Sequence, residues 1–70
     1  MNRTEMRMAV ARENKTYKAL AAAIKVSEQA LYNKMRGESE FKESEIKTLA
    51  RELNLSMEEV NLIFFDNEVN

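Results

Sequence analysis

The segment from Ser27 to Gly37 constrains the fold more than any other part of the chain. Ser27 can accept a hydrogen bond from a free backbone N–H at the start of a helix, and Gly37 can take the left-handed conformation that ends one. These signals stand ten residues apart, so together they predict one short helix. Leu31 and Met35 are one helical turn apart and are expected to face the core. The segment therefore predicts a helix with an apolar inner face and a polar outer face.

Another helix is predicted immediately before this one, from Tyr17 to about Ile24, with Thr16 as its cap. The turn between the two helices is short, so they must cross closely, and the small side chain of Ala21 fits such a crossing. The turn contains no glycine, and we expect Lys25 to adopt a positive φ at a cost of about 1 kcal/mol. Two helices in this arrangement form a helix-turn-helix, whose second helix enters the major groove of DNA.

Three further helices are predicted from apolar spacing and capping signals. Apolar residues recur at helical spacing within residues 2–13 and again within residues 43–53, where Asn54 can end the helix in the left-handed conformation. The S-x-x-E sequence that begins at Ser56 has the form of a capping box and opens a helix that runs through about Phe65. No strand pattern is present, so the sequence predicts an all-α fold of five helices.

Length and composition indicate one small domain over residues 1–70, with a frayed acidic end from about residue 66. The chain has no cysteine and no histidine, which excludes disulfides, thiolate nucleophiles and Cys/His zinc sites, and we expect no cofactor. Catalysis has little support, because an active site would need paired carboxylates in a cleft. No apolar run approaches the roughly 18 residues of a membrane span, and we expect a cytoplasmic protein without membrane contact.

Charge is distributed unevenly although the net charge is only −1. Residues 1–37 hold eight Lys and Arg against three Glu, a balance of +5, whereas residues 38–70 hold three basic and nine acidic residues, a balance of −6. A basic half that contains the helix-turn-helix is expected of a surface that faces DNA phosphates. The alternative is that both halves are solvated surfaces whose polarity is accidental.

The ordered set of apolar, small and capping residues resembles the Cro and phage-repressor type of helix-turn-helix family, which is XRE-like. The resemblance covers about residues 15–63 and implies a compact domain of the lambda-repressor-like type. The stretch from Lys34 to Phe41 is similar to a subgroup of small phage and mobile-element proteins, in which a phenylalanine replaces the family's usual proline. The matching residues are Thr16-Tyr17-Lys18-Ala19-Leu20-Ala21, Ile24-Lys25-Val26-Ser27, Leu31, Gly37, Leu49-Ala50 and Leu53-Asn54-Leu55-Ser56.

The resemblance also implies which residues contact DNA. Gln29 and Asn33 fall at positions that commonly reach base edges in this family, and their amides suit adenine. Glu28 and Tyr32 fall at two further such positions. Glu28 suits cytosine, although the helix dipole alone also explains a carboxylate there, and Tyr32 suits a thymine methyl group or a phosphate. The candidates for phosphate contacts are Thr16, Tyr17, Lys18, Lys34, Arg36, Ser39 and Lys42.

The chain departs from the family pattern at three positions. The family often has Gln where this chain has Tyr17, usually has Gly where it has Lys25, and often has an apolar residue where it has Lys34. A common phosphate contact is therefore in question at Tyr17. We expect the Lys34 side chain to keep its stem against the core and its amine in water.

Two functions follow from these observations. The first is a Cro-like transcriptional regulator of a phage genetic switch that binds double-stranded operator DNA, with a homodimer or cooperative neighbours supplying affinity. The second is a modulator or antirepressor that binds a partner repressor protein and alters its DNA binding. The consecutive apolar residues Ile63, Phe64 and Phe65 cover more than one helical face, which makes them candidates for a partner or dimer contact.

Overall fold

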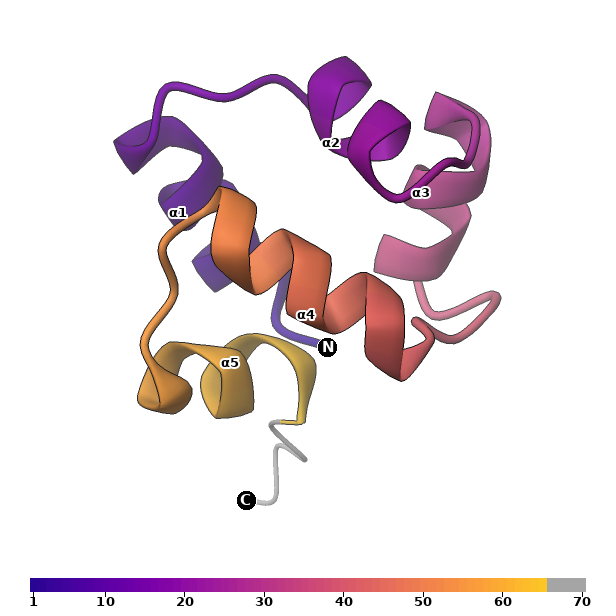
Figure 1. Ribbon diagram of the computed structural model, residues 1–70. Helices are drawn as coiled ribbons and strands as arrows, with labels where there is room; N and C mark the ends of the chain where they lie inside the picture. Colours follow the sequence, from indigo (N-terminus) through magenta and orange to yellow (C-terminus); the bar gives the residue numbers. More distant parts are fainter. Residues whose placement is uncertain (66–70) are drawn as a thin grey trace.

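The computed structural model describes residues 1–65, which form five α-helices and no strand (Figure 1). The all-α prediction is confirmed, and every helix begins and ends within two residues of its predicted bounds. The expected frayed end from residue 66 lies outside the described residues. The helices are α1 (Arg3–Arg12), α2 (Tyr17–Ala23), α3 (Glu28–Met35), α4 (Glu43–Glu52) and α5 (Met57–Phe64).

The helices start where side chains can accept hydrogen bonds from exposed backbone N–H groups. Thr16, Ser27 and Ser56 each accept one from the residue three positions later, at 3.0 to 3.1 Å, as predicted. Asn2 does the same for α1. Each such cap is worth about 1 kcal/mol. The ammonium side chain of Lys42, which precedes α4, cannot accept a hydrogen bond, and the Lys42 backbone N–H donates instead to the Glu45 carboxylate at 2.9 Å.

The first four helices all end in a left-handed residue. The expected positive φ is confirmed at Lys25 (64°), Gly37 (86°) and Asn54 (51°), and Asn14 (57°) ends α1 in the same way. In each case the next backbone N–H donates to a carbonyl five residues earlier, which satisfies a group that the helix leaves open. Lys25 is the residue type least suited to this conformation among the four.

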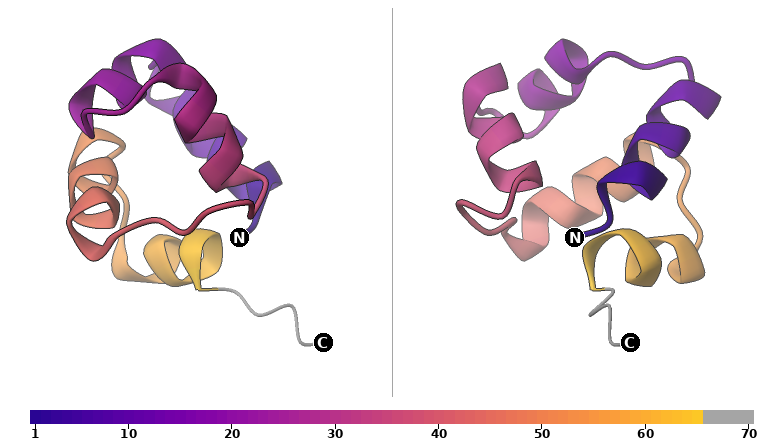
Figure 2. Two further views of the ribbon diagram at one scale, coloured as in Figure 1. Left: turned by 90° about the vertical axis from the view of Figure 1, so that its right-hand side faces the viewer. Right: turned by 180° about the vertical axis from the view of Figure 1, so that it is seen from behind.

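The core draws at least one large side chain from every helix. The six large side chains that are fully buried are Met6, Leu20, Leu31, Leu49, Leu53 and Ile63. Ala21 is buried where α2 meets its neighbours, as its small size predicts. Helix α4 runs through the middle of the domain, with α2 and α3 on one side and α5 on the other (Figures 1 and 2).

The end of α5 corrects one part of the sequence analysis. Ile63 is only 1% exposed, so it belongs to the core and is not available as a partner or dimer contact. Its carbonyl also accepts a hydrogen bond from the Asn2 backbone N–H at 2.8 Å, which holds α5 to the start of the chain. Phe64 is half-buried and packs edge-on against Phe41, with ring centroids 5.2 Å apart. Phe65 alone of the three is exposed, at 55%.

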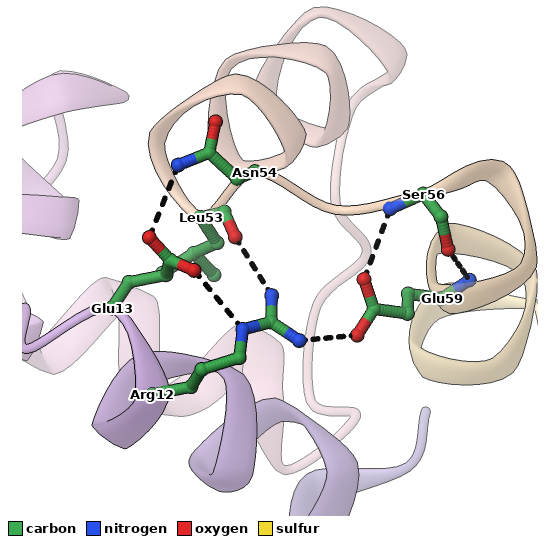
Figure 3. A network of polar contacts seen from close by, with 6 residues as sticks. All are labelled: Arg12, Glu13, Leu53, Asn54, Ser56 and Glu59. Carbon is green, nitrogen blue, oxygen red and sulfur yellow. Dashed lines mark hydrogen bonds and ion pairs between the residues drawn. The ribbon is translucent and has the colours of Figure 1, made fainter.

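A polar network around Arg12 joins three helix ends (Figure 3). The guanidinium binds the Glu13 and Glu59 carboxylates and donates to the Leu53 carbonyl at 2.9 Å. Glu13 also accepts from Asn54, at 3.0 Å. The hydrogen bond from Arg12 lowers the pKa of Glu59. The pKa of Glu13 is lowered mainly by the hydrogen bond from Asn54 and next by the one from Arg12. Arg12 therefore connects the end of α1 to the end of α4 and the start of α5.

Candidate nucleic-acid interface

The outer face of α3 carries a continuous polar row. Gln29 donates a hydrogen bond from its amide nitrogen to the Asn33 amide oxygen at 3.1 Å, and Arg36 donates to the same oxygen. These residues stand at i, i+4 and i+7, so they share one face of the helix. Gln29 is exposed and Asn33 is half-buried. Glu28 is also exposed, at the start of the helix. The row thus orients two amides before any ligand is present.

A tyrosine pair connects this face to the start of α2. The rings of Tyr17 and Tyr32 lie 5.6 Å apart between centroids and are tilted by 50°. Tyr17 packs against the core, and burial raises the pKa of its hydroxyl. Tyr32 is 37% exposed. The Tyr17 hydroxyl can donate a hydrogen bond, as an ordinary tyrosine hydroxyl does.

Lys34, predicted as a phosphate contact, is instead paired with groups of the protein itself at the corner between α3 and α4. Its side chain is 11% exposed, its Nζ lies 3.2 Å from the Glu45 carboxylate, and it donates to the Glu40 carbonyl at 3.0 Å. The ammonium also lies 5.9 Å from the centre of the Phe41 ring. Glu45 is buried and needs a compensating charge, which Lys34 supplies. The amine thus fixes the end of α3 to the start of α4.

The remaining phosphate candidates occupy three places. Thr16 and Lys18 are exposed at the start of α2, although the Thr16 oxygen already caps the helix. Ser39 and Lys42 are exposed in the loop that follows α3. Arg36 is exposed beyond the end of α3 and is shared between Asn33 and the Glu38 carboxylate, 3.2 Å away. These groups, unlike Lys34, are accessible to a polyanion.

In the folded domain, several cations of the basic half predicted from the sequence are paired with carboxylates. Arg12 pairs with Glu59, Lys15 lies 3.6 Å from Glu52, and Lys34 pairs with Glu45. Arg36 also lies 3.2 Å from Glu38. Four of the eight cations in residues 1–37 are therefore paired with carboxylates from the acidic half. Within residues 1–65, the cations of the basic half that form no ion pair are Arg3, Arg7, Lys18 and Lys25.

Two of these cations line a pocket that the sequence analysis missed. Arg3 and Arg7 are one turn apart on α1, and they meet Arg36 and the tyrosine pair around a pocket of ≈ 140 Å³. Met35 forms its apolar side. The i, i+4 spacing of the two arginines was visible in the sequence, but only the fold places α1 against α3.

Other kinds of site receive no support from the described part of the chain. Residues 1–65 contain no group of three or more metal-ligating side chains. The helices they form are too short and too polar to cross a bilayer.

Comparison with known proteins agrees with this geometry. Residues 6–60 match the family model described as Helix-turn-helix, which covers most of the chain and all of α2 and α3. No curated protein and no solved structure matches the chain. The fold, the capped α2–α3 pair and the family match together place the protein in the helix-turn-helix family of the Cro and repressor type, a family of DNA-binding transcription regulators.

Proposed function

We propose that this protein is a Cro-like regulator of a phage genetic switch that blocks a promoter by binding operator DNA through α3. The observation that carries the proposal is the polar row of Gln29, Asn33 and Arg36 on the outer face of a capped recognition helix. Asn and Gln amides pair with the adenine edge in the major groove, and each good bidentate contact discriminates by about 1–3 kcal/mol. The row supplies two such amides on one helical face.

The other site residues surround this row in the proposed complex. Glu28 faces a cytosine at the entry of the helix, while Thr16, Tyr17 and Lys18 contact phosphates at one side. Arg36, Ser39 and Lys42 contact phosphates at the other. A single unit with about six phosphate contacts binds weakly at physiological salt, so the functional form is a homodimer on two half-sites. After Ile63 is assigned to the core, the exposed Phe65 and the half-buried Phe64 are the candidate dimer contacts.

A second candidate function rests on a different surface. A mainly apolar groove lies between α4 and α5. It is lined by the apolar residues Phe41, Ile46, Ala50, Met57, Val60 and Phe65 and by the charged residues Glu43 and Lys47. A partner repressor whose own apolar segment enters this groove would make the protein a modulator or antirepressor. The net charge of −1, low for a plain DNA binder, favours this alternative.

Two experiments separate these functions. Duplex DNA from the gene's own upstream region should be bound with an affinity that falls steeply with salt, and Gln29→Ala should relax the preference at one base position. Asn61→Ala, which removes an exposed amide from α5 instead, is the matched control. Co-expression with the neighbouring repressor gene should yield a stable complex only if the modulator function holds. Absence of any sequence preference at low salt would refute the operator function.

A further inference from the structure

The pocket between α1 and α3 joins three guanidinium groups and two phenols. Arg3 and Arg7 come from α1 and Arg36 from the end of α3, and Tyr17 and Tyr32 form the tilted aromatic pair. Both views of Figure 2 place the start of α1 beside the C-terminal end of α3. These side chains are drawn from three separate parts of the chain, so their meeting is a property of the fold.

The charge of this pocket is largely uncompensated within the domain. Arg3 and Arg7 form no ion pair with any of residues 1–65, and Arg36 has only the exposed Glu38 beside it. Elsewhere in the domain, cations such as Arg12 and Lys34 have carboxylate partners. Three like charges around one pocket repel one another unless an anion lies between them. The pocket is therefore electrostatically suited to an anion.

The size and donor set narrow the class of anion. A pocket of ≈ 140 Å³ is smaller than the roughly 300–1,000 Å³ of small-molecule sites. Guanidinium groups match the geometry of phosphate oxygens, and the hydroxyls of tyrosines can donate to the same oxygens. A single phosphate group fits these properties, whereas a whole nucleotide or cofactor does not.

We propose that this pocket receives a DNA backbone phosphate, which makes α1 a second DNA-contacting element beside the recognition helix. The proposal rests on the proposed operator function. Its link to DNA is Arg36, which lines the pocket and also donates to Asn33 in the base-reading row. Arg36 thus connects the pocket that would hold the phosphate to the face of α3 that would read bases. It follows that Tyr32, which lines the pocket, contacts the backbone and does not read a base.

The test compares two double variants that remove equal charge. Arg3→Gln/Arg7→Gln empties the α1 side of the pocket, and Lys47→Gln/Arg51→Gln removes two exposed cations from α4. Binding to the duplex that wild type prefers and to a random-sequence duplex is measured from 50 to 200 mM salt. Loss of one phosphate contact should reduce the slope of log K against log salt by about 0.9, and weaken binding about five-fold at 150 mM. Both duplexes should be affected equally, and the α4 variant should bind like wild type. Circular dichroism melting of each variant confirms folding.

The possible outcomes separate this proposal from the operator function. If wild type binds its preferred duplex and the α1 variant shows an unchanged slope, the pocket proposal is overturned and the operator function stands. If wild type binds no duplex at low salt, both are overturned. If the slope falls but Gln29→Ala leaves base preference intact, the pocket proposal holds and the assigned base reading fails. A final measurement follows the binding of inorganic phosphate to wild type by NMR. If free phosphate binds in the pocket but Arg3→Gln/Arg7→Gln has the same DNA affinity as wild type, the pocket is a site for a small anion, which contradicts the proposal.

Discussion

The cations at the α3–α4 corner and those on the outer face of α1 and α3 have opposite surroundings. Lys34 is nearly buried and is held by Glu45, a backbone carbonyl and an aromatic ring. Arg3 and Arg7 are exposed and have no ion-pair partner within residues 1–65. The basic N-terminal half therefore serves two purposes. Some of its cations stabilise the fold, and others remain available to an anionic ligand.

The largest expected effect is at the α3–α4 corner. Lys34→Ala should lower the free energy of unfolding by about 3 kcal/mol, because it leaves the Glu45 carboxylate buried without its partner. Urea denaturation followed by circular dichroism measures this loss. The double variant Lys34→Met/Glu45→Gln removes both charges and should recover much of the stability. A loss below about 0.5 kcal/mol for Lys34→Ala would show that the corner behaves like an exposed pair.

The turn before α3 should give a smaller effect of opposite sign. Lys25→Gly should stabilise the protein by about 0.5–1 kcal/mol, because glycine adopts a positive φ without a Cβ penalty but loses more chain entropy on folding. Asn14→Gly is the matched control at another left-handed helix end, and it should gain less because Asn tolerates this conformation better. Thermal melting compares the two, and equal gains would contradict the assigned strain at Lys25.

The Arg12 network should add a modest acid sensitivity. The pKa values of Glu13 and Glu59 lie below 4.5 in the folded protein, so their contribution is present above that pH and is lost as the pH falls through the folded values. Melting temperature should therefore fall below about pH 4.5. In Glu13→Gln/Glu59→Gln this part of the fall should be absent, since neither side chain then titrates. If the melting temperature depends on pH in the same way in both proteins, Glu13 and Glu59 do not cause the loss of stability at low pH.

The smallest expected change distinguishes the two roles of Tyr32. Tyr32→Phe keeps the ring next to Tyr17 and removes only the hydroxyl. If Tyr32 contacts the backbone, affinity should fall by about ten-fold and equally for all duplex sequences, because one hydrogen bond to a charged phosphate is worth about 1.5 kcal/mol at the low end of its range. Competition binding with duplexes that differ at single bases measures this. A change in base preference would show that Tyr32 contacts a base and would contradict its assignment to the DNA backbone.

Local signals explain how much of this structure was predictable. The caps at Thr16, Ser27 and Ser56 and the left-handed end at Gly37 involve residues within one turn of each other, so the sequence specifies them directly. Helix order and bounds follow from these signals and from apolar spacing. The buried role of Ile63 did not follow, because its apolar neighbours carry the same signal.

Contacts between distant residues were not predictable in this way. Arg12 and Glu59 are 47 positions apart, and nothing local links them. Lys34 was expected to point into water because no nearby residue identifies Glu45 as its partner. The pocket of Arg3, Arg7 and Arg36 likewise depends on how α1 packs beside α3. Charge counted along the chain consequently overestimated the basic surface available to DNA.

Selection from a random duplex pool by wild type and by Asn33→Ala shows whether α3 reads DNA sequence through its polar row. Wild type should enrich one sequence, and Asn33→Ala, which removes the amide at the centre of the α3 row, should lose preference at one position while retaining the rest. Both proteins should melt cooperatively, since the Asn33 side chain lies outside the core. Enrichment of no sequence by folded wild type, or identical enriched sequences from both proteins, would contradict the claim that α3 reads DNA through this row.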